Sequence, residues 1–337
     1  MTLFEAEITP GMAAAEVVDL AVAAEEAGFD RLGISDVVYW PDPYLLQVLA
    51  AERTERILIG SMVTNPYTRH AVAHASALAT LHEVSGGRAF LGIGLGAGLE
   101  QLGFDDGRPV RTLRTAVESI RALLAGEEVD GGRLVRPPAT PIPVAIGTRS
   151  RQVMGLAGEL ADIALVGARH FTAETVATYR SWLAAGAGRV GRDPATIDMA
   201  PRVTLCVSED GAAARSSMKR YAAHYLDIVG GGGGGPEVDD EQLAAIRGAL
   251  GRSTGWYFDH DRHDDPELEA LIDDDLVRAF AIVGTPDECV AQLQGIVELG
   301  VTSVSCNLGA VRRDGNTMAA GLAETIAGAA SILPSVR

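Results

Sequence analysis

The segment that decides the fold runs from Gly60 to Gly98 and reads GSMVTNPYTRHAVAHASALATLHEVSGGRAFLGIGLGAG. Its start completes an apolar, β-branched run over 57–63, which predicts a buried strand. Apolar residues at helical spacing then cover 70–84, and a second buried strand follows over 89–95. Two buried strands joined by a helix predict neighbouring parallel strands of one sheet.

The same alternation extends in both directions along the chain. Gly28 and Gly300 each follow a helical stretch and precede a buried strand, which is typical of a glycine helix cap. The predicted strands cover 3–8, 29–34, 57–63, 89–95, 143–146, 163–166, 197–207 and 301–306. The predicted helices cover 12–27, 70–84, 111–124, 151–158, 172–185, 287–299 and 316–332. Eight such strands favour a closed (β/α)8 barrel, the TIM barrel, over an open doubly wound sheet, with 1–337 as a single domain.

Residues 230–275 do not fit the alternation and are predicted to be an insertion before the last strand. The insertion opens with the glycine run 230–235, which costs much entropy to order and so predicts a partly mobile segment. A helix is expected over 242–250. The stretch 258–265 combines His and Asp at close spacing, so it is either a metal site or a solvated acidic loop. Because no second group with ligand spacing accompanies it, we expect the acidic loop and no metal.

Composition narrows the class of partner. The 337 residues carry a formal net charge of −17, which argues against nucleic acid and anionic membranes as partners. No apolar run approaches the length of a membrane span without a charge or a glycine, and the N-terminus does not look like a secretory signal. The three cysteines are too few for a disulfide framework. We therefore expect a cytoplasmic protein with buried thiols.

In a parallel barrel, functional groups lie at the C-terminal ends of the strands. Asp36 follows the second strand and either faces the barrel mouth or caps the next helix. Thr64 and Asn65 follow the third strand and either offer hydrogen bonds to a ligand or form a plain turn. His70 and His74 have a spacing that can bind metal, but without a third ligand they are expected to be ordinary helix residues.

Glycines follow the next three strands. Gly94 and Gly96 belong to a loose GxGxxA pattern over 92–97, and we expect them to let a flat ring or an extended chain approach the backbone. After the fifth strand, a glycine turn, a hydroxyl and two guanidinium groups precede the free N–H groups of a helix, which predicts an anion site. Its residues are Gly147, Thr148, Arg149 and Arg151, with Gly167, Ala168 and Arg169 on the neighbouring loop. In the alternative, these arginines pair with surface carboxylates.

Three segments resemble the luciferase-like monooxygenase superfamily, and within it the deazaflavin-dependent methylenetetrahydromethanopterin reductase branch. They are 25–36 (EEAGFDRLGISD), 60–98 and 283–304 (VGTPDECVAQLQGIVELGVTSV). The resemblance covers most of the chain outside 230–275. It implies a (β/α)8 barrel that binds coenzyme F420, or alternatively FMN, at its mouth. Relatives are often dimers, so we expect a homodimer or a higher homo-oligomer.

The resemblance also implies roles for individual residues. The cofactor ring would rest on a bulge after the third strand, where relatives have a non-proline cis peptide bond that corresponds to Met62–Val63. The cofactor phosphate would lie at Gly147, Thr148, Arg149, Gly167 and Ala168, where the residues themselves predict an anion site. Glu7 and Asp36 match acidic residues of the reductase branch and become the candidate catalytic groups, Glu7 for proton transfer and Asp36 for a hydrogen bond to ring or substrate.

One departure is visible. Many deazaflavin enzymes carry a histidine directly after this aspartate, whereas this chain has Val37. A mechanism that uses that histidine for proton transfer is therefore not available here. Three hypotheses follow: an F420-dependent oxidoreductase that acts on a small organic substrate, an FMN-dependent monooxygenase, and a flavin-binding protein without catalytic activity.

Overall fold

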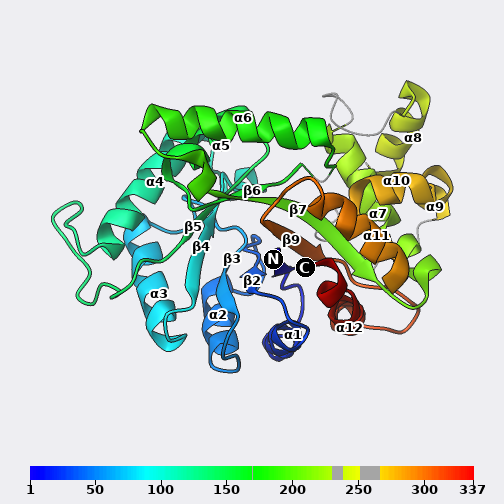
Figure 1. Cartoon of the computed structure of the whole chain (residues 1–337), viewed down its shortest axis with the longest axis horizontal. Coiled ribbons are helices and arrows are strands. Elements are labelled where there is room, and N and C mark those ends of the chain that lie inside the picture. The colour runs from blue at the N-terminus through cyan, green and yellow to red at the C-terminus, as the bar shows by residue number, and fades with distance from the viewer. Residues whose placement is uncertain (169, 230–237, 251–265) are drawn as a thin grey trace.

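Eight parallel strands close into a barrel in the computed structural model, which describes residues 1–168, 170–229, 238–250 and 266–337 (Figure 1). Around the barrel the strand order is β6-β5-β4-β3-β2-β1-β9-β7, and pairing of β6 with β7 completes the circle. The strands are β1 Leu3–Ile8, β2 Arg31–Ile34, β3 Leu58–Ser61, β4 Ala89–Ile93, β5 Val144–Thr148, β6 Ile163–Val166, β7 Asp198–Val207 and β9 Ser303–Leu308. The predicted (β/α)8 barrel is confirmed, and all eight of its strands were expected from the sequence.

A ninth strand, β8 (Ile282–Gly284), lies outside the barrel and was not predicted. It pairs with the end of β7, where Leu205 lies opposite Ile282. Strand β7 is long enough to pair with β6 over its first four residues and with β8 over its last three. With three residues, β8 is too short to show a readable pattern in the sequence.

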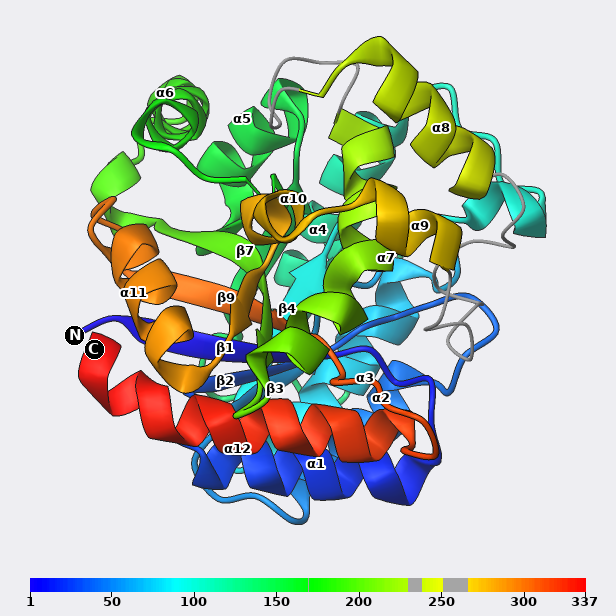
Figure 2. The ribbon, with the colours of Figure 1, turned by 90° about the vertical axis from the view of Figure 1, so that its right-hand side faces the viewer.

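The helices surround the barrel (Figures 1 and 2). They are α1 Ala14–Glu26, α2 Pro43–Ala51, α3 Ala71–Val84, α4 Pro109–Leu124, α5 Arg151–Leu160, α6 Ala173–Arg189, α7 Gly211–Val229, α8 Asp240–Leu250, α9 Pro266–Leu271, α10 Asp274–Phe280, α11 Pro286–Val297 and α12 Met318–Val336. Helix α8 confirms the helix expected over 242–250. The glycine run 230–235 and the acidic stretch 258–265 lie outside the described residues.

Side chains alternate between two environments along every barrel strand. Outward-facing residues such as Phe4, Ala6 and Ile8 of β1 pack under the helices in the main hydrophobic core. Inward-facing residues divide the barrel interior into two halves. The apolar half consists of Met62, Phe90, Ala145, Ile163, Leu165 and Ala200. The polar half consists of Glu5, Glu7, Arg31, Arg202, Thr204, Ser303, Ser305 and Asn307, all on β1, β2, β7 and β9.

The block Ser85-Gly86-Gly87-Arg88 explains how β3 is held at its N-terminal end. Gly86 and Gly87 have positive φ angles of 65° and 95°, which a glycine adopts without strain. They turn the chain so that the Arg88 guanidinium donates hydrogen bonds to the carbonyl oxygens of Thr54 and Ile57, each at 2.8 Å. Arg88 thereby fixes the loop between α2 and β3.

Helix α12 is long and apolar enough to cross a membrane by length and composition alone. In the structure it lies beside α1 (Figure 2), and its side chains Ile326, Ile332 and Leu333 are buried in the core. The Arg337 side chain that follows it forms an ion pair of 3.0 Å with Asp30, at the start of β2. These contacts are those of a core helix of a globular fold.

Candidate active site

The end of β3 carries the feature around which the barrel mouth is built. The peptide bond between Met62 and Val63 is cis, as the family resemblance implies. The Met62 side chain points into the apolar half of the interior and is 3% exposed. The Val63 side chain lies across the ends of β4 and β5, where one of its methyl groups approaches Gly94 and another approaches Gly147. The bulge, Gly94 and Gly147 are therefore one contiguous surface.

The structure explains why these positions are glycines, and the explanation differs from the one that the sequence suggested. We expected Gly94 and Gly96 to leave room for a ligand, but protein atoms fill the space beside each. A Cβ atom on Gly94 would lie 3.1 Å from a Val63 methyl carbon, and one on Gly147 would lie 3.0 Å from the other. Gly96 has a φ of +84° and packs against Leu99. The glycines thus allow close packing of the bulge, and their contact with a cofactor stays a prediction.

Asp36 and Thr64 meet at the ends of β2 and β3. The Thr64 hydroxyl donates a hydrogen bond of 2.6 Å to Oδ2 of Asp36. Burial raises the pKa of Asp36 above its ordinary value, and the Thr64 hydrogen bond and the positive charge of Arg69 oppose that rise. Asp36 is half-buried and precedes no helix directly, so it does not act as a helix cap. Its position after the C-terminal end of β2 is consistent with the predicted place at the mouth.

Asn65 is engaged in its own turn. Its Oδ1 accepts hydrogen bonds from the backbone N–H groups of Tyr67 and Thr68 at 2.9 and 3.0 Å. Its carbonyl oxygen lies 3.0 Å from Nε2 of His74, whose Nδ1 lies 2.8 Å from the Tyr44 hydroxyl. Burial lowers the pKa of His74 to about 4, so the ring is neutral near pH 7. As expected, His74 is a helix residue that supports the loop. Within the described ranges no group of three metal-ligating side chains occurs.

Glu7 forms an ion pair across the barrel interior that the sequence did not reveal. Both of its carboxylate oxygens bind the Arg202 guanidinium, and Oε1 also accepts a hydrogen bond of 2.9 Å from the Ser35 hydroxyl. Glu7 is 1% exposed. Burial by itself would lower the pKa of Arg202. The Glu7 carboxylate outweighs this effect, so the pKa of Arg202 lies above its ordinary value. Glu7 therefore holds Arg202 in place in the polar half of the interior, and its predicted part in proton transfer stays a prediction.

The predicted anion site forms around the start of α5. The Thr148 hydroxyl accepts a hydrogen bond of 2.9 Å from the N–H of Ser150, and the Ser150 hydroxyl caps the helix by accepting one from Val153. The N–H of Gly167 donates to the carbonyl oxygen of Thr148 at 2.8 Å, which joins the two predicted loops. Arg149 is exposed, and among the described residues its guanidinium forms no salt bridge. The alternative, in which Arg149 pairs with a surface carboxylate, is thus not observed in the part of the chain that the structure describes.

The remaining residues of the anion site have plainer surroundings. The side chain of Arg149 runs over Gly167, where a Cβ atom would lie 3.2 Å from Cγ of Arg149. Ala168 is half-buried and packs against the main core. Arg169 lies outside the described residues.

Helix α7 adds two tyrosines that sequence reasoning missed. Tyr221 and Tyr225 are buried, and their ring centroids lie 4.5 Å apart. Both phenols interact electrostatically with Arg202 and Glu7, and Tyr225 also interacts with Arg149. The helix therefore connects the polar half of the interior to the predicted anion site.

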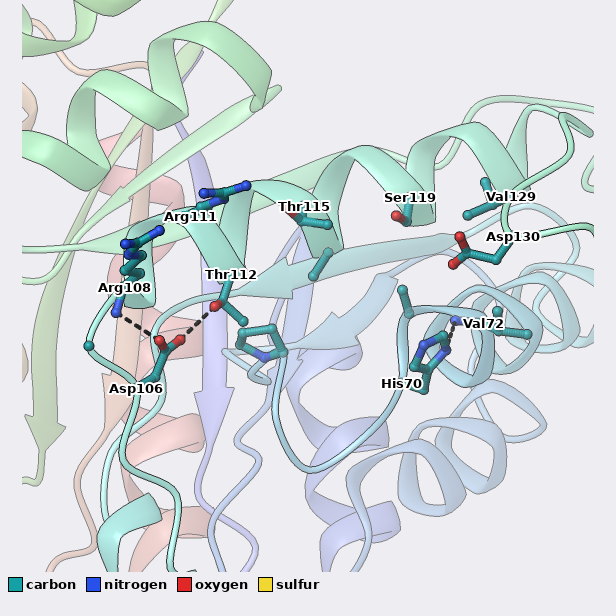
Figure 3. Close-up of a pocket in the computed structure, with 14 residues that line it drawn as sticks. His70, Val72, Asp106, Arg108, Arg111, Thr112, Thr115, Ser119, Val129 and Asp130 are labelled. Carbon is teal, nitrogen blue, oxygen red and sulfur yellow. Dashed lines mark hydrogen bonds between the residues drawn. The ribbon is translucent and has the colours of Figure 1, made fainter.

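A cavity of about 600 Å³ lies elsewhere, between the start of α3 and α4 (Figure 3). Asp106 lines it and accepts hydrogen bonds from the Thr112 hydroxyl and the N–H of Arg108. The Tyr67 hydroxyl also donates to Asp106, at 2.7 Å. None of the predicted site residues lines this cavity.

Comparison with known proteins identifies the class. The model of the luciferase-like monooxygenase family matches residues 1–303, and the chain belongs to that family. It is 32% identical to the 5,10-methylenetetrahydromethanopterin reductase of Methanolobus tindarius, over 89% of this chain and 92% of the relative. It is 34% identical to an F420-dependent hydroxymycolic acid dehydrogenase of Mycobacterium tuberculosis, over 61% of this chain and 63% of the relative.

A solved structure agrees. The chain superimposes on the coenzyme F420-dependent tetrahydromethanopterin reductase of Methanopyrus kandleri with a TM-score of 0.81 and 25% identity, covering 100% of this chain and 99% of that one. These similarities confirm the predicted superfamily and branch. They also confirm that the chain is an oxidoreductase enzyme, which contradicts the hypothesis of a flavin-binding protein without catalytic activity.

Proposed function

We propose that this enzyme uses coenzyme F420 to transfer a hydride to or from a small organic substrate at the barrel mouth. The observation that carries the proposal is the similarity to F420-dependent oxidoreductases along almost the whole chain. The cis peptide bond of Met62–Val63 and the donors at the start of α5 in this chain support it. FMN-dependent monooxygenation is the alternative within the same family.

The residues present suit this cofactor. Coenzyme F420 is an anion with a phosphate and a glutamate tail, and the chain has a net charge of −17, so local donors must hold it. Arg149, Arg151 and the first N–H groups of α5 are such donors, and among the described residues neither arginine forms a salt bridge. When bound, the deazaflavin supplies or accepts the hydride.

The other residues position the reacting groups and exclude water. The Met62–Val63 bulge offers an apolar surface for a flat ring. Asp36, held by Thr64, can hydrogen-bond the ring edge or the substrate. Glu7 fixes Arg202 and Ser35 on the opposite side of the interior. Since hydride chemistry belongs to the cofactor, these few groups suffice.

The test of the anion site is Arg149→Gln, with binding of F420 measured by the change in cofactor fluorescence. Removing one charge-assisted contact should weaken binding by about tenfold, or about 1.4 kcal/mol. Arg192→Gln is the matched control, because Arg192 binds the carbonyl oxygen of Ala161 at 2.8 Å, away from the start of α5. Equal affinity of Arg149→Gln and the wild type would remove the anion site from the account.

The proposal includes a homodimer in the cytoplasm. Helices α2 and α3 lie side by side, and their outer faces expose Leu45 (68%), Leu49 (48%) and Val72 (42%). Leu45 and Leu49 lie one turn apart on α2, and neighbouring exposed apolar side chains favour a protein interface. Light scattering on purified protein should give twice the mass of one chain, and Leu45→Glu together with Leu49→Glu should give the monomer. A monomeric wild type would contradict this part of the proposal.

A further inference from the structure

Asn307 is a buried polar residue of the barrel interior. It is the second-last residue of β9, and it is 3% exposed. Its neighbours on the strand, Cys306 and Leu308, pack outward in the main core, so Asn307 points into the barrel interior. In the described part of the chain no hydrogen bond joins its side-chain amide to another residue. Buried amides are normally hydrogen-bonded, so an unpartnered one is a candidate for contact with a ligand.

The strand register places Asn307 in the polar half, close to the mouth. It lies opposite Glu7 of β1 on one side and opposite Thr204 of β7 on the other. Glu5, Arg31 and Ser305 occupy the deeper positions of the same half. The Met62–Val63 bulge belongs to the apolar half. Asn307 therefore lies in the half of the interior that does not carry the cofactor surface.

The charges around Asn307 indicate which ligand group suits it. Glu7 and Arg202 are the charged neighbours, and both oxygens of Glu7 are bound to the Arg202 guanidinium. The pair is neutral overall, because Arg202 already binds the Glu7 carboxylate. A carboxylate or phosphate next to Asn307 would be repelled by the negative charge of Glu7. An amide offers both a donor and an acceptor to an uncharged group.

We propose that Asn307 is a specificity-determining residue that binds an uncharged hydrogen-bonding group of the substrate, such as a carbonyl or an amide, with Thr204 beside it. This inference rests on the proposed function, because that function makes the polar half the substrate side. It excludes substrates that present a carboxylate or a phosphate at this position.

The test uses benzamide and benzoate, two probes of the same shape that differ in charge. Binding to the F420-loaded enzyme is measured by isothermal titration or ligand-observed NMR. Benzamide should bind the wild type at least tenfold more tightly than benzoate. Asn307→Leu should weaken benzamide binding at least tenfold, and Ser305→Ala, two residues deeper on the same strand, should leave it unchanged. If Asn307→Leu does not fold, Thr204→Val tests the proposal instead. Thr204→Val should weaken benzamide binding two- to fivefold.

Three results would overturn the inference: equal binding of the two probes, binding of neither probe, or an unchanged benzamide affinity in Asn307→Leu. In each case, an ordered water would be the partner of the amide. Each protein is also titrated with F420, whose affinity should stay within twofold in the Asn307 and Thr204 variants. A wild type that does not bind F420 contradicts the proposed function, whereas the preference between the two probes, measured without cofactor, still decides the role of Asn307.

Discussion

The Thr64 hydroxyl donates a hydrogen bond of 2.6 Å to the carboxylate of Asp36, so the ends of β2 and β3 are joined at the mouth. Because this bond favours the charged form, it partly offsets the rise in the pKa of Asp36 that burial causes. Removing it with Thr64→Val should raise that pKa further. The acid limb of the pH profile of kcat/KM for F420 turnover should then shift to higher pH by about 0.5–1 unit.

The matched control is Thr68→Val, which removes a hydroxyl from the same loop that contacts Asn65 and not Asp36. Asp36→Ala completes the set. If cofactor affinity and turnover survive Asp36→Ala unchanged, Asp36 does not belong to the site.

Removing one partner of the Glu7–Arg202 ion pair should reduce the free energy of unfolding far more than replacing both partners with uncharged residues. Arg202→Met leaves Glu7 charged and unpaired in the interior, and we expect a loss of about 3–5 kcal/mol in the free energy of unfolding. Combining Arg202→Met with Glu7→Gln removes both charges and should recover much of that loss. Urea denaturation of the two single variants and the double variant measures the coupling.

The same variants separate two roles for Glu7. If Glu7 only holds Arg202, a folded double variant keeps a measurable turnover number at saturating substrate. If Glu7 transfers a proton, the double variant is folded but inactive at every pH. Additive losses of stability, with no coupling between the two sites, would contradict the ion pair itself.

Glu5 should make stability fall as the pH rises through neutrality. It is 1% exposed, and burial raises its pKa to about 7, although Arg31 opposes the rise. Since the folded-state pKa lies above the unfolded value, the contribution of Glu5 to stability is fully present below about pH 4.5 and is lost as the pH passes 7. The rise of the Glu5 pKa from 4.5 to about 7 corresponds to a loss of about 3 kcal/mol in the free energy of unfolding.

Glu5→Gln imitates the protonated side chain, so its stability relative to the wild type should increase from about pH 4.5 to about pH 7.5 and then stay constant. Arg31 keeps its hydrogen bond of 2.9 Å to Asp198 in the variant. Glu298→Gln, on an exposed carboxylate, is the control and should show no such trend. A stability difference between Glu5→Gln and wild type that does not change with pH would show that Glu5 does not titrate in this range.

The barrel was predictable because strand patterns are strong where both faces are buried. The stretch 60–98 and its repeats predicted all eight barrel strands, since apolar runs followed by helices are a local signal. Helix α2 was missed because its sequence, PYLLQVLAA, is apolar nearly all round and lacks the polar face that marks an amphipathic helix. Helix α7 was missed because it follows β7 next to the glycine-rich region, where the repeat was no longer visible.

The site was predictable only where neighbouring residues carry the signal. Asp36 and Thr64 each follow a strand, so their meeting at the mouth follows from the topology. Arg202 is a single cation in an apolar strand, and its partner Glu7 is 195 residues away. Asn307 lay beyond the predicted end of the last strand, which the structure extends to Leu308. Pairings that distant along the chain are set by the closed barrel and leave no local pattern.

The central claim is that the mouth binds a deazaflavin, and competition between two cofactors tests it most directly. Purified protein is titrated with coenzyme F420 and, separately, with FMN, and the fluorescence of each cofactor is followed. We expect saturable binding of F420 that excess FMN does not displace, together with weaker binding of F420 in Arg149→Gln. Tight binding of FMN with no response to F420 would contradict the account and make the enzyme a flavin-dependent member of its family.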